Sequence, residues 1–179
     1  MRTRVAKPGE RIFIFKIIQS NLYGMVRGFP YRVLAIPEEF TLYQFAKVIN
    51  EHFGFAFDHP FGFYSNLTQY FASEEGYELF ADFPEMQGLI DDDCRFDGVK
   101  KTRVNQAFTQ PKKKMLFLFD YGDEWHFRVE LKTIEPAQQG KPYPVCIKSV
   151  GKARSQYDEP DELEELSRID DDEGNDNTV

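Results

Sequence analysis

Residues 41–54, TLYQFAKVINEHFG, constrain the fold more than any other segment of the chain. Thr41 is a typical helix-capping residue and Gln44 follows three positions later, which is the spacing of a capping box. Gly54 supplies the left-handed conformation that ends many helices. The sequence therefore predicts a helix over residues 42–53. Its apolar residues recur at helical spacing on one face, which requires a sheet to cover: Leu42, Phe45, Ala46, Ile49 and Phe53.

Two strands are predicted before this helix. Residues 11–18, RIFIFKII, are apolar on both alternating faces, which indicates a central strand covered on both sides. Residues 31–36, YRVLAI, form a second short apolar run that ends at a proline. The segment between them holds two glycines and a proline, so the two runs predict a hairpin.

A second hairpin is predicted near residue 120. Residues 115–120, MLFLFD, read as a buried strand, and a polar turn over residues 121–124 follows. The next segment alternates, and we expect one side to face the same core as the helix while the other side faces solvent. The core side holds Trp125, Phe127, Val129 and Leu131, and the solvent side holds His126, Arg128 and Glu130.

The order of strands, one clear helix and more strands predicts an α+β fold. We expect a largely antiparallel or mixed sheet with the helix 42–53 packed on it, in a β-grasp-like order. Residues 76–83 and 145–150 are predicted as further strands, and residues 102–108 as a short helix. The length favours one domain over residues 1–157, followed by an acidic tail over residues 158–179.

Charge is divided unevenly along the chain. The tail carries 11 acidic residues and one basic residue, whereas the body carries 19 acidic and 21 basic residues. We expect this tail to be flexible, because it offers little apolar surface to offset the entropy of ordering. Two acid-free basic stretches lie in the body, at residues 100–114 and 141–154. We expect the tail to shield them transiently from other anions.

Several familiar functions are excluded or disfavoured. No run reaches the roughly 18 apolar residues of a membrane helix, so no membrane partner is expected. The two cysteines, Cys94 and Cys146, are too few for a disulfide framework or a zinc site, which favours a cytoplasmic location. The chain has no Walker loop, Rossmann glycine set or nucleophile elbow, and we expect no cofactor. Asp91–Asp93 lack the spacing of a calcium loop.

The segment FLFDYGDEWHFRVEL resembles the D-[FY]-G-D-x-W signature of an uncharacterised family, the Ri-plasmid open-reading-frame-three-like proteins. The resemblance spans about residues 11–158, and other features of the family follow in the expected order. They are Arg32, then Thr41, Leu42, Ile49, Phe53 and Gly54, then His59, Phe61 and Phe63, and finally Tyr143, Pro144, Cys146 and Gly151. The family's usual histidine, two residues after the tryptophan, is replaced by Phe127, and His126 comes one residue early. The resemblance implies no established activity.

The acidic turn is the main candidate for a binding site. Asp120 and Asp123 are expected to bond turn amides, with Gly122 at positive φ, although oxygen ligands for a metal are the alternative. The candidate binding residues are Asp120, Asp123, Glu124, Trp125, His126 and His59, together with the basic residues Lys100, Lys101, Arg103, Lys112, Lys113 and Lys114. No catalytic residue is assigned.

Three functions remain open from sequence. The first is a non-enzymatic interaction module that binds an unidentified protein partner. The second is a mobile-element accessory protein that binds nucleic acid through the two basic stretches. The third is a metal-dependent hydrolase that uses the turn over residues 120–124.

Overall fold

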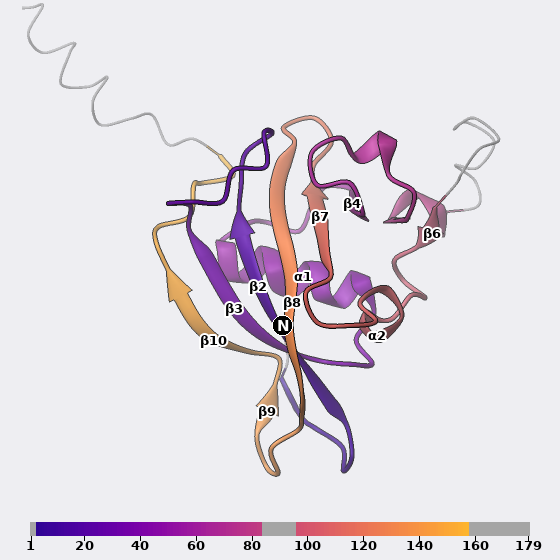
Figure 1. The fold of residues 1–179 in the computed structure, drawn as a ribbon, viewed down its shortest axis with the longest axis vertical. Coiled ribbons are helices and arrows are strands. Elements are labelled where there is room, and N and C mark those ends of the chain that lie inside the picture. Colours follow the sequence, from indigo (N-terminus) through magenta and orange to yellow (C-terminus); the bar gives the residue numbers. More distant parts are fainter. Residues whose placement is uncertain (1–2, 84–95, 158–179) are drawn as a thin grey trace, which may run out of the picture.

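The structure is a computed structural model that describes residues 3–83 and 96–157 (Figure 1). Strands provide most of its regular secondary structure. In chain order the elements are β1 (Arg4–Val5), β2 (Arg11–Gln19), β3 (Tyr31–Pro37), α1 (Leu42–Phe53), β4 (Phe61–Tyr64), η1 (Tyr70–Ala72), β5 (Gly76–Glu78), η2 (Phe80–Asp82), β6 (Asp97–Gly98), α2 (Val104–Ala107), β7 (Lys114–Phe119), β8 (Trp125–Pro136), β9 (Pro142–Tyr143) and β10 (Val145–Val150).

One eight-stranded sheet organises the fold, with the strand order β10-β3-β2-β8-β7-β4-β5-β6. Its neighbouring strands run antiparallel except β5 and β6, which are parallel. The hairpin β2–β3 precedes α1, the hairpin β7–β8 follows it, and β2 and β8 pair antiparallel at the centre of the sheet (Figure 1). The predicted α+β class, with one main helix on a mixed sheet, is confirmed.

Helix α1 begins and ends where the sequence predicts. The backbone N–H of Gln44 donates to Thr41 Oγ1 at 3.2 Å, and the backbone N–H of Thr41 donates to Gln44 Oε1 at 3.0 Å, so the capping box is formed. Gly54 ends the helix in the left-handed conformation with φ 78°. The helix crosses one face of the sheet and buries its apolar side there (Figure 1).

The core between α1 and the sheet contains the predicted side of β8. Phe127, Val129 and Leu131 are fully buried in it. Trp125 packs at its margin, with its ring centroid 4.9 Å from that of Phe55. The ring centroid of Phe127 also lies 5.0 Å from that of Phe53 at the end of α1. The predicted orientation of this strand toward the helix is therefore confirmed.

The opposite face of the sheet is covered in two places. One cluster, near β1 and β9, contains Ile12, Ala35 and Tyr143. The other covers β4 and β7 with side chains from the loops around residues 67–70, 96 and 121. Between them the sheet carries half-exposed side chains of β2, β3 and β8, so this part of the face is accessible to a partner.

The predicted strand over residues 76–83 is only partly correct. The strand stops at Glu78, and a 3-10 turn follows over Phe80–Asp82. The Asp82 carboxylate accepts a hydrogen bond from the backbone N–H of Lys100 at 2.8 Å, which holds the chain in a turn there. The short helix predicted within residues 102–108 is present as α2.

Some predictions concern residues outside the described part of the chain. They include Asp91–Asp93 and Cys94, and the acidic tail from residue 158 onward. Within residues 3–83 and 96–157, no helix combines the length and the apolar character needed to cross a bilayer.

Candidate functional site

The turn between β7 and β8 is held by Asp120. Its side-chain Oδ1 accepts a hydrogen bond from the backbone N–H of Gly122 at 2.9 Å, and its carbonyl accepts one from the N–H of Glu124 at 2.7 Å. The left-handed conformations fall on Asp120 (φ 58°) and Glu124 (φ 50°), so the prediction that Gly122 would take the positive φ is wrong. Aspartate tolerates this conformation because its short polar side chain bonds locally.

His59 joins this turn to the loop after α1. Its Nε2 lies 3.5 Å from Asp120 Oδ2, and its Nδ1 lies 2.8 Å from Asp58 Oδ1. The hydrogen bond with Asp58, and then the charges of Asp120 and Asp123, raise the pKa of His59 above its ordinary value. The structure thus brings together two residues, His59 and Asp120, that the sequence could nominate only separately.

Two further residues bind Asp58, and the sequence does not predict either contact. The hydroxyl of Tyr157 donates to Asp58 Oδ2 at 2.8 Å, and the amide of Gln156 donates to Asp58 Oδ1 at 3.2 Å. Nearly a hundred residues separate them from Asp58, so no local spacing announces the contact. Within residues 3–83 and 96–157, no three His, Cys, Asp or Glu side chains are grouped as a metal site would require.

His126 does not face solvent as predicted. Only 3% of its surface is exposed, because the segment after β2 covers this end of the sheet. The backbone N–H of Ser20 donates to the His126 carbonyl at 2.8 Å and the Ser20 hydroxyl donates to it at 3.2 Å. Neither ring nitrogen of His126 has a hydrogen-bond partner among the described residues. Burial lowers the pKa of this imidazole, so we expect it to be neutral at pH 7.

A cavity of about 260 Å³ lies beside His126, where β2 ends and β8 begins. Arg154 forms one wall: its Nη2 donates to the Ser20 carbonyl at 3.2 Å, and its Cζ lies 6.0 Å from the Trp125 ring centroid. The indole Nε1 of Trp125 is buried and also lacks a partner among the described residues. The lining residues are Ser20, Asn21, Leu22, Tyr23, Asp123, Glu124, Trp125, His126 and Arg154.

The loop beside this cavity is unusually apolar for an exposed segment. Leu22 is 51% exposed, Tyr23 83% and Met25 55%. The side-chain oxygen of Asn21 accepts the backbone N–H groups of Tyr23 and Met25 at 3.2 and 3.0 Å, which fixes the loop that carries them. We call these three apolar residues together with the cavity the tip site. Exposed apolar patches of this kind are typical of interaction surfaces.

Buried His126 should make stability depend on pH. Its folded-state pKa lies below 6.5, so below about pH 6.5 the unfolded chain binds more protons and the protein loses stability as pH falls. His126→Gln should therefore lose less free energy of unfolding between pH 7 and pH 5 than the wild type, measured by urea denaturation. His52, whose pKa is lowered by burial, adds a loss of the same sign in both proteins.

His59 provides a control of opposite sign. Its raised folded-state pKa contributes stability that is present at low pH and is lost as pH rises through that pKa. His59→Gln should therefore make the loss on acidification steeper. Equal losses in the wild type and in His126→Gln would show that His126 is not a buried neutral group.

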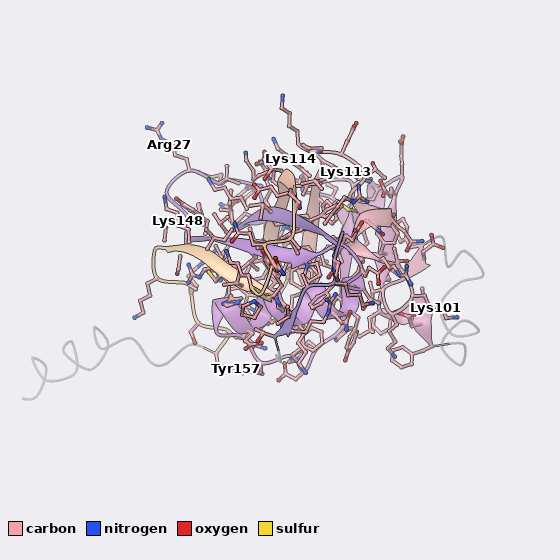
Figure 2. All side chains as sticks on the ribbon, turned by 90° about the horizontal axis from the view of Figure 1, so that it is seen from below. Arg27, Lys101, Lys113, Lys114, Lys148 and Tyr157 are labelled. Carbon is pink, nitrogen blue, oxygen red and sulfur yellow. The ribbon has the colours of Figure 1, made fainter. Side chains whose placement is uncertain are left out.

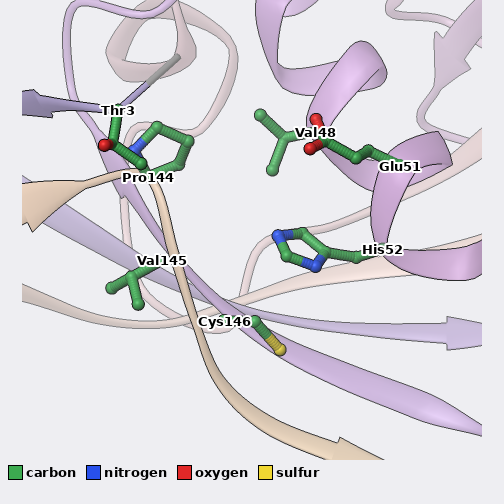
Figure 3. A pocket seen from close by; sticks show the side chains of 7 residues that line it. All are labelled: Thr3, Val48, Glu51, His52, Pro144, Val145 and Cys146. Carbon is green, nitrogen blue, oxygen red and sulfur yellow. The ribbon is translucent and has the colours of Figure 1, made fainter. Parts of the chain in front are cut away.

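A second cavity, of about 190 Å³, lies between α1 and the start of β10 (Figure 3). His52 from α1 and Cys146 from β10 both line it. The Cys146 thiol donates to the Lys148 carbonyl at 3.3 Å and packs against the main core. Burial lowers the pKa of His52. The lining of this cavity offers a ligand fewer polar side chains than the tip site does.

The first basic stretch does not form one surface. Lys113 Nζ pairs with Glu75 at 2.7 Å, and Lys100 Nζ lies 4.0 Å from the Phe83 ring centroid. Arg103 precedes α2, where its backbone N–H donates to Gln106 Oε1 at 2.7 Å. Lys112, at φ 73°, belongs to the turn before β7. Figure 2 shows Lys101 far from Lys113 and Lys114.

Comparisons with known proteins agree on a family and a fold. The sequence profile of the family described as plasmid pRiA4b ORF-3-like protein matches residues 29–170. No protein with a curated function matches the chain significantly. The fold is similar to the crystal structure of a protein of unknown function, MM3350, from Methanosarcina mazei Go1. The two share 19% sequence identity and a TM-score of 0.66 over 93% of this chain and 85% of that one.

Proposed function

This chain belongs to the family of plasmid pRiA4b ORF-3-like proteins, which are uncharacterised, and from its own side chains we propose that it is a non-enzymatic interaction module. The tip site binds an extended segment of a partner protein. The segment carries a basic side chain between apolar neighbours. We expect the module to work in the cytoplasm, as the low cysteine content suggests.

The observation that carries this proposal is that two residues lining the cavity, Trp125 and His126, have buried polar atoms without partners. Buried polar atoms usually have hydrogen-bond partners, and each unsatisfied one costs about 1–3 kcal/mol. Both ring nitrogens of His126 and the indole nitrogen of Trp125 lack partners among the described residues. A neutral imidazole offers one donor and one acceptor, and an indole offers one donor. The N–H and C=O groups of an extended peptide match this set.

The charge of the cavity specifies the partner's side chain. Asp123 and Glu124 line it, and neither is in an ion pair within the described part of the chain. The cation on the same wall, Arg154, is bound to the Ser20 carbonyl instead. A lysine or arginine of the partner would therefore find two available carboxylates.

The rim supplies the apolar contact area. Tyr23 is the most exposed of its large apolar residues, and tyrosines are over-represented among the residues that dominate binding energies. Leu22 and Met25 stand beside it in the loop fixed by Asn21. Apolar residues on each side of the partner's basic residue would cover this rim.

The single tryptophan of the chain makes a direct test possible. Its indole N–H gives one signal in a ¹H–¹⁵N spectrum, and Trp125 lines the cavity. Two matched pools of acetylated pentapeptides are titrated, with apolar flanks and either Arg or Glu at the centre. We expect the Arg pool to shift the indole signal and the Glu pool to leave it unchanged.

Variants locate the binding. Asp123→Asn with Glu124→Gln, or Tyr23→Ala alone, should weaken binding of the Arg pool by about fivefold or more, the effect of losing a residue worth over 1 kcal/mol. Glu39→Gln removes an exposed carboxylate on a distant loop and should change nothing. Equal shifts with both pools, or no shift at millimolar peptide, would contradict the proposal.

The hydrolase hypothesis predicts a different result, which is measured by thermal melting with added metal. If the turn over residues 120–124 binds a divalent metal, Mg²⁺ or Mn²⁺ should raise the melting temperature of the wild type by linkage. Asp123→Asn should abolish that rise. A rise in melting temperature with metal, together with no binding of either peptide pool, would favour the hydrolase hypothesis over the interaction module.

A further inference from the structure

The accessible part of the sheet opposite α1 gathers basic side chains from four strands, β2, β7, β8 and β10. From its geometry we infer that this surface binds single-stranded nucleic acid. We call it the open face and define it by Lys16, Tyr31, Val33, Lys114, Arg128, Glu130, Lys132 and Lys148. It is independent of the tip site, and it differs from the two continuous basic stretches expected from sequence.

The strand register places these side chains in a row. Lys148 of β10 is opposite Val33 of β3, Val33 is opposite Lys16 of β2, and Lys16 is opposite Glu130 of β8. Glu130 is in turn opposite Lys114 of β7. With neighbouring strands 4.7–4.9 Å apart, the three lysines stand about 10 Å from one another across roughly 19 Å of sheet. Such a line of cations suits an extended polyanion better than a single phosphate.

The positive charges on this face are poorly compensated. Glu130 is paired with Lys132, whose Nζ lies 2.9 Å from Glu130 Oε1. Among residues 3–83 and 96–157, no carboxylate forms an ion pair with Lys16, Lys114 or Lys148. Arg128 adds another cation, and its Nη2 donates to the carbonyl of Gly24 at 2.8 Å. An anionic ligand would relieve this accumulation of like charge.

An aromatic ring lies within the same row of cations. Lys16 Nζ is 4.3 Å from the ring centroid of Tyr31, and Lys148 Nζ is 5.8 Å from it. Tyr31 is half-exposed on this face. Proteins that bind single strands combine a basic track for the backbone with aromatic rings on which bases stack. A purely electrostatic surface for a protein partner would not need the ring.

The open face is bounded on both sides. The cluster of Ile12, Ala35 and Tyr143 covers one end, and the cluster of Tyr64, Leu116 and Leu118 covers the other. Figure 2 shows Lys114 and Arg27 projecting on this side of the sheet, away from α1. The row of cations runs beside these two clusters, across β10, β3, β2, β8 and β7.

The test is fluorescence anisotropy with a labelled dT20 oligonucleotide and the full chain at several salt concentrations. Lys16→Gln, Lys114→Gln and Lys148→Gln together should weaken binding at least tenfold. Each phosphate contact contributes about 0.7 to the log–log salt slope, so that slope should fall by about two. Tyr31→Leu should weaken binding without changing the slope.

A matched triple variant controls for net charge. Lys7→Gln, Lys47→Gln and Lys101→Gln remove the same charge outside the open face and should weaken binding much less. A chain ending at Tyr157, with its melting temperature first checked against the full chain, removes the acidic tail as an internal competitor and should bind at least as tightly.

Three outcomes would overturn the inference. The first is equal weakening by both triple variants. The second is absence of binding by both the full chain and the shortened chain at low salt. The third is binding of a heparin oligosaccharide as tight as that of dT20 with no effect of Tyr31→Leu, which would assign the face to polyanions in general.

Discussion

Phe45→Ala should lower the free energy of unfolding by about 3–5 kcal/mol, a large part of the stability of a domain of this size. Phe45 is fully buried at the centre of α1. Its ring centroid lies 4.6 Å from that of Phe15 on β2, 5.9 Å from Phe63 on β4 and 6.3 Å from Phe108 after α2. Alanine favours the helix more than phenylalanine does, so the loss would come from packing alone.

The measurement is urea denaturation followed by circular dichroism. Phe71→Ala is the matched control, because it makes the same chemical change at a ring that is 70% exposed, and it should cost about 0.5 kcal/mol or less. A loss below 1 kcal/mol in Phe45→Ala would mean that α1 does not pack on the sheet through this face.

The elements with strong local signals were predictable from sequence. The capping box and Gly54 fix both ends of α1 through interactions within four residues, so a single segment contains the information. The alternation of Trp125, Phe127, Val129 and Leu131 likewise fixes which side of β8 faces the core. The order of strands in the sheet was not predictable, since it depends on pairings between segments more than a hundred residues apart, such as β2 with β8.

The candidate site shows the same limit. The acidic turn was found because its residues are adjacent, but the cavity beside it depends on Ser20 and Arg154, which lie far away in the chain. His126 was misplaced because alternation tells which side of the sheet a residue faces and not what covers that side. The segment after β2 covers it, and its backbone and hydroxyl bonds to the His126 carbonyl have no sequence signature.

The basic residues illustrate how a sheet regroups charge. Sequence proximity suggested one surface for residues 100–114, yet Lys113 is paired with Glu75 while Lys114 joins the open face. Lys16 lies in the strand predicted over residues 11–18 as apolar on both faces, so no local pattern marks it as part of a basic surface. Cross-strand register therefore creates a row of cations from residues that are nowhere near one another along the chain.

Replacing Arg32 is expected to have the second large effect on the free energy of unfolding. This buried arginine is not matched with a carboxylate among the described residues and instead donates to backbone carbonyls. Its Nε bonds His52 O at 2.9 Å, and its Nη1 bonds Tyr31 O, Val150 O and Gly151 O at 3.0, 3.1 and 3.3 Å. One guanidinium thus ties the last turn of α1 to the end of β10.

The position suits a cation for two reasons. His52 lies in the last turn of α1, where carbonyls have no partner within the helix and carry the negative end of its dipole. The Arg32 Cζ also lies 4.8 Å from the ring centroid of Phe53, within the range of a cation–π contact. Both interactions stabilise a charge that burial alone would disfavour.

Arg32→Met should therefore lower the free energy of unfolding by about 2–4 kcal/mol, because hydrogen bonds from charged donors contribute about 1.5–3 kcal/mol each and are not additive. Methionine keeps the apolar stem but leaves four carbonyls without this donor. Arg32→Lys keeps the charge but lacks the planar fork that reaches several carbonyls at once, so it should fall between the wild type and Arg32→Met. Surface substitutions usually change the free energy of unfolding by about 0.5 kcal/mol or less. A change that small in Arg32→Met would show that the guanidinium does not hold α1 and β10 together.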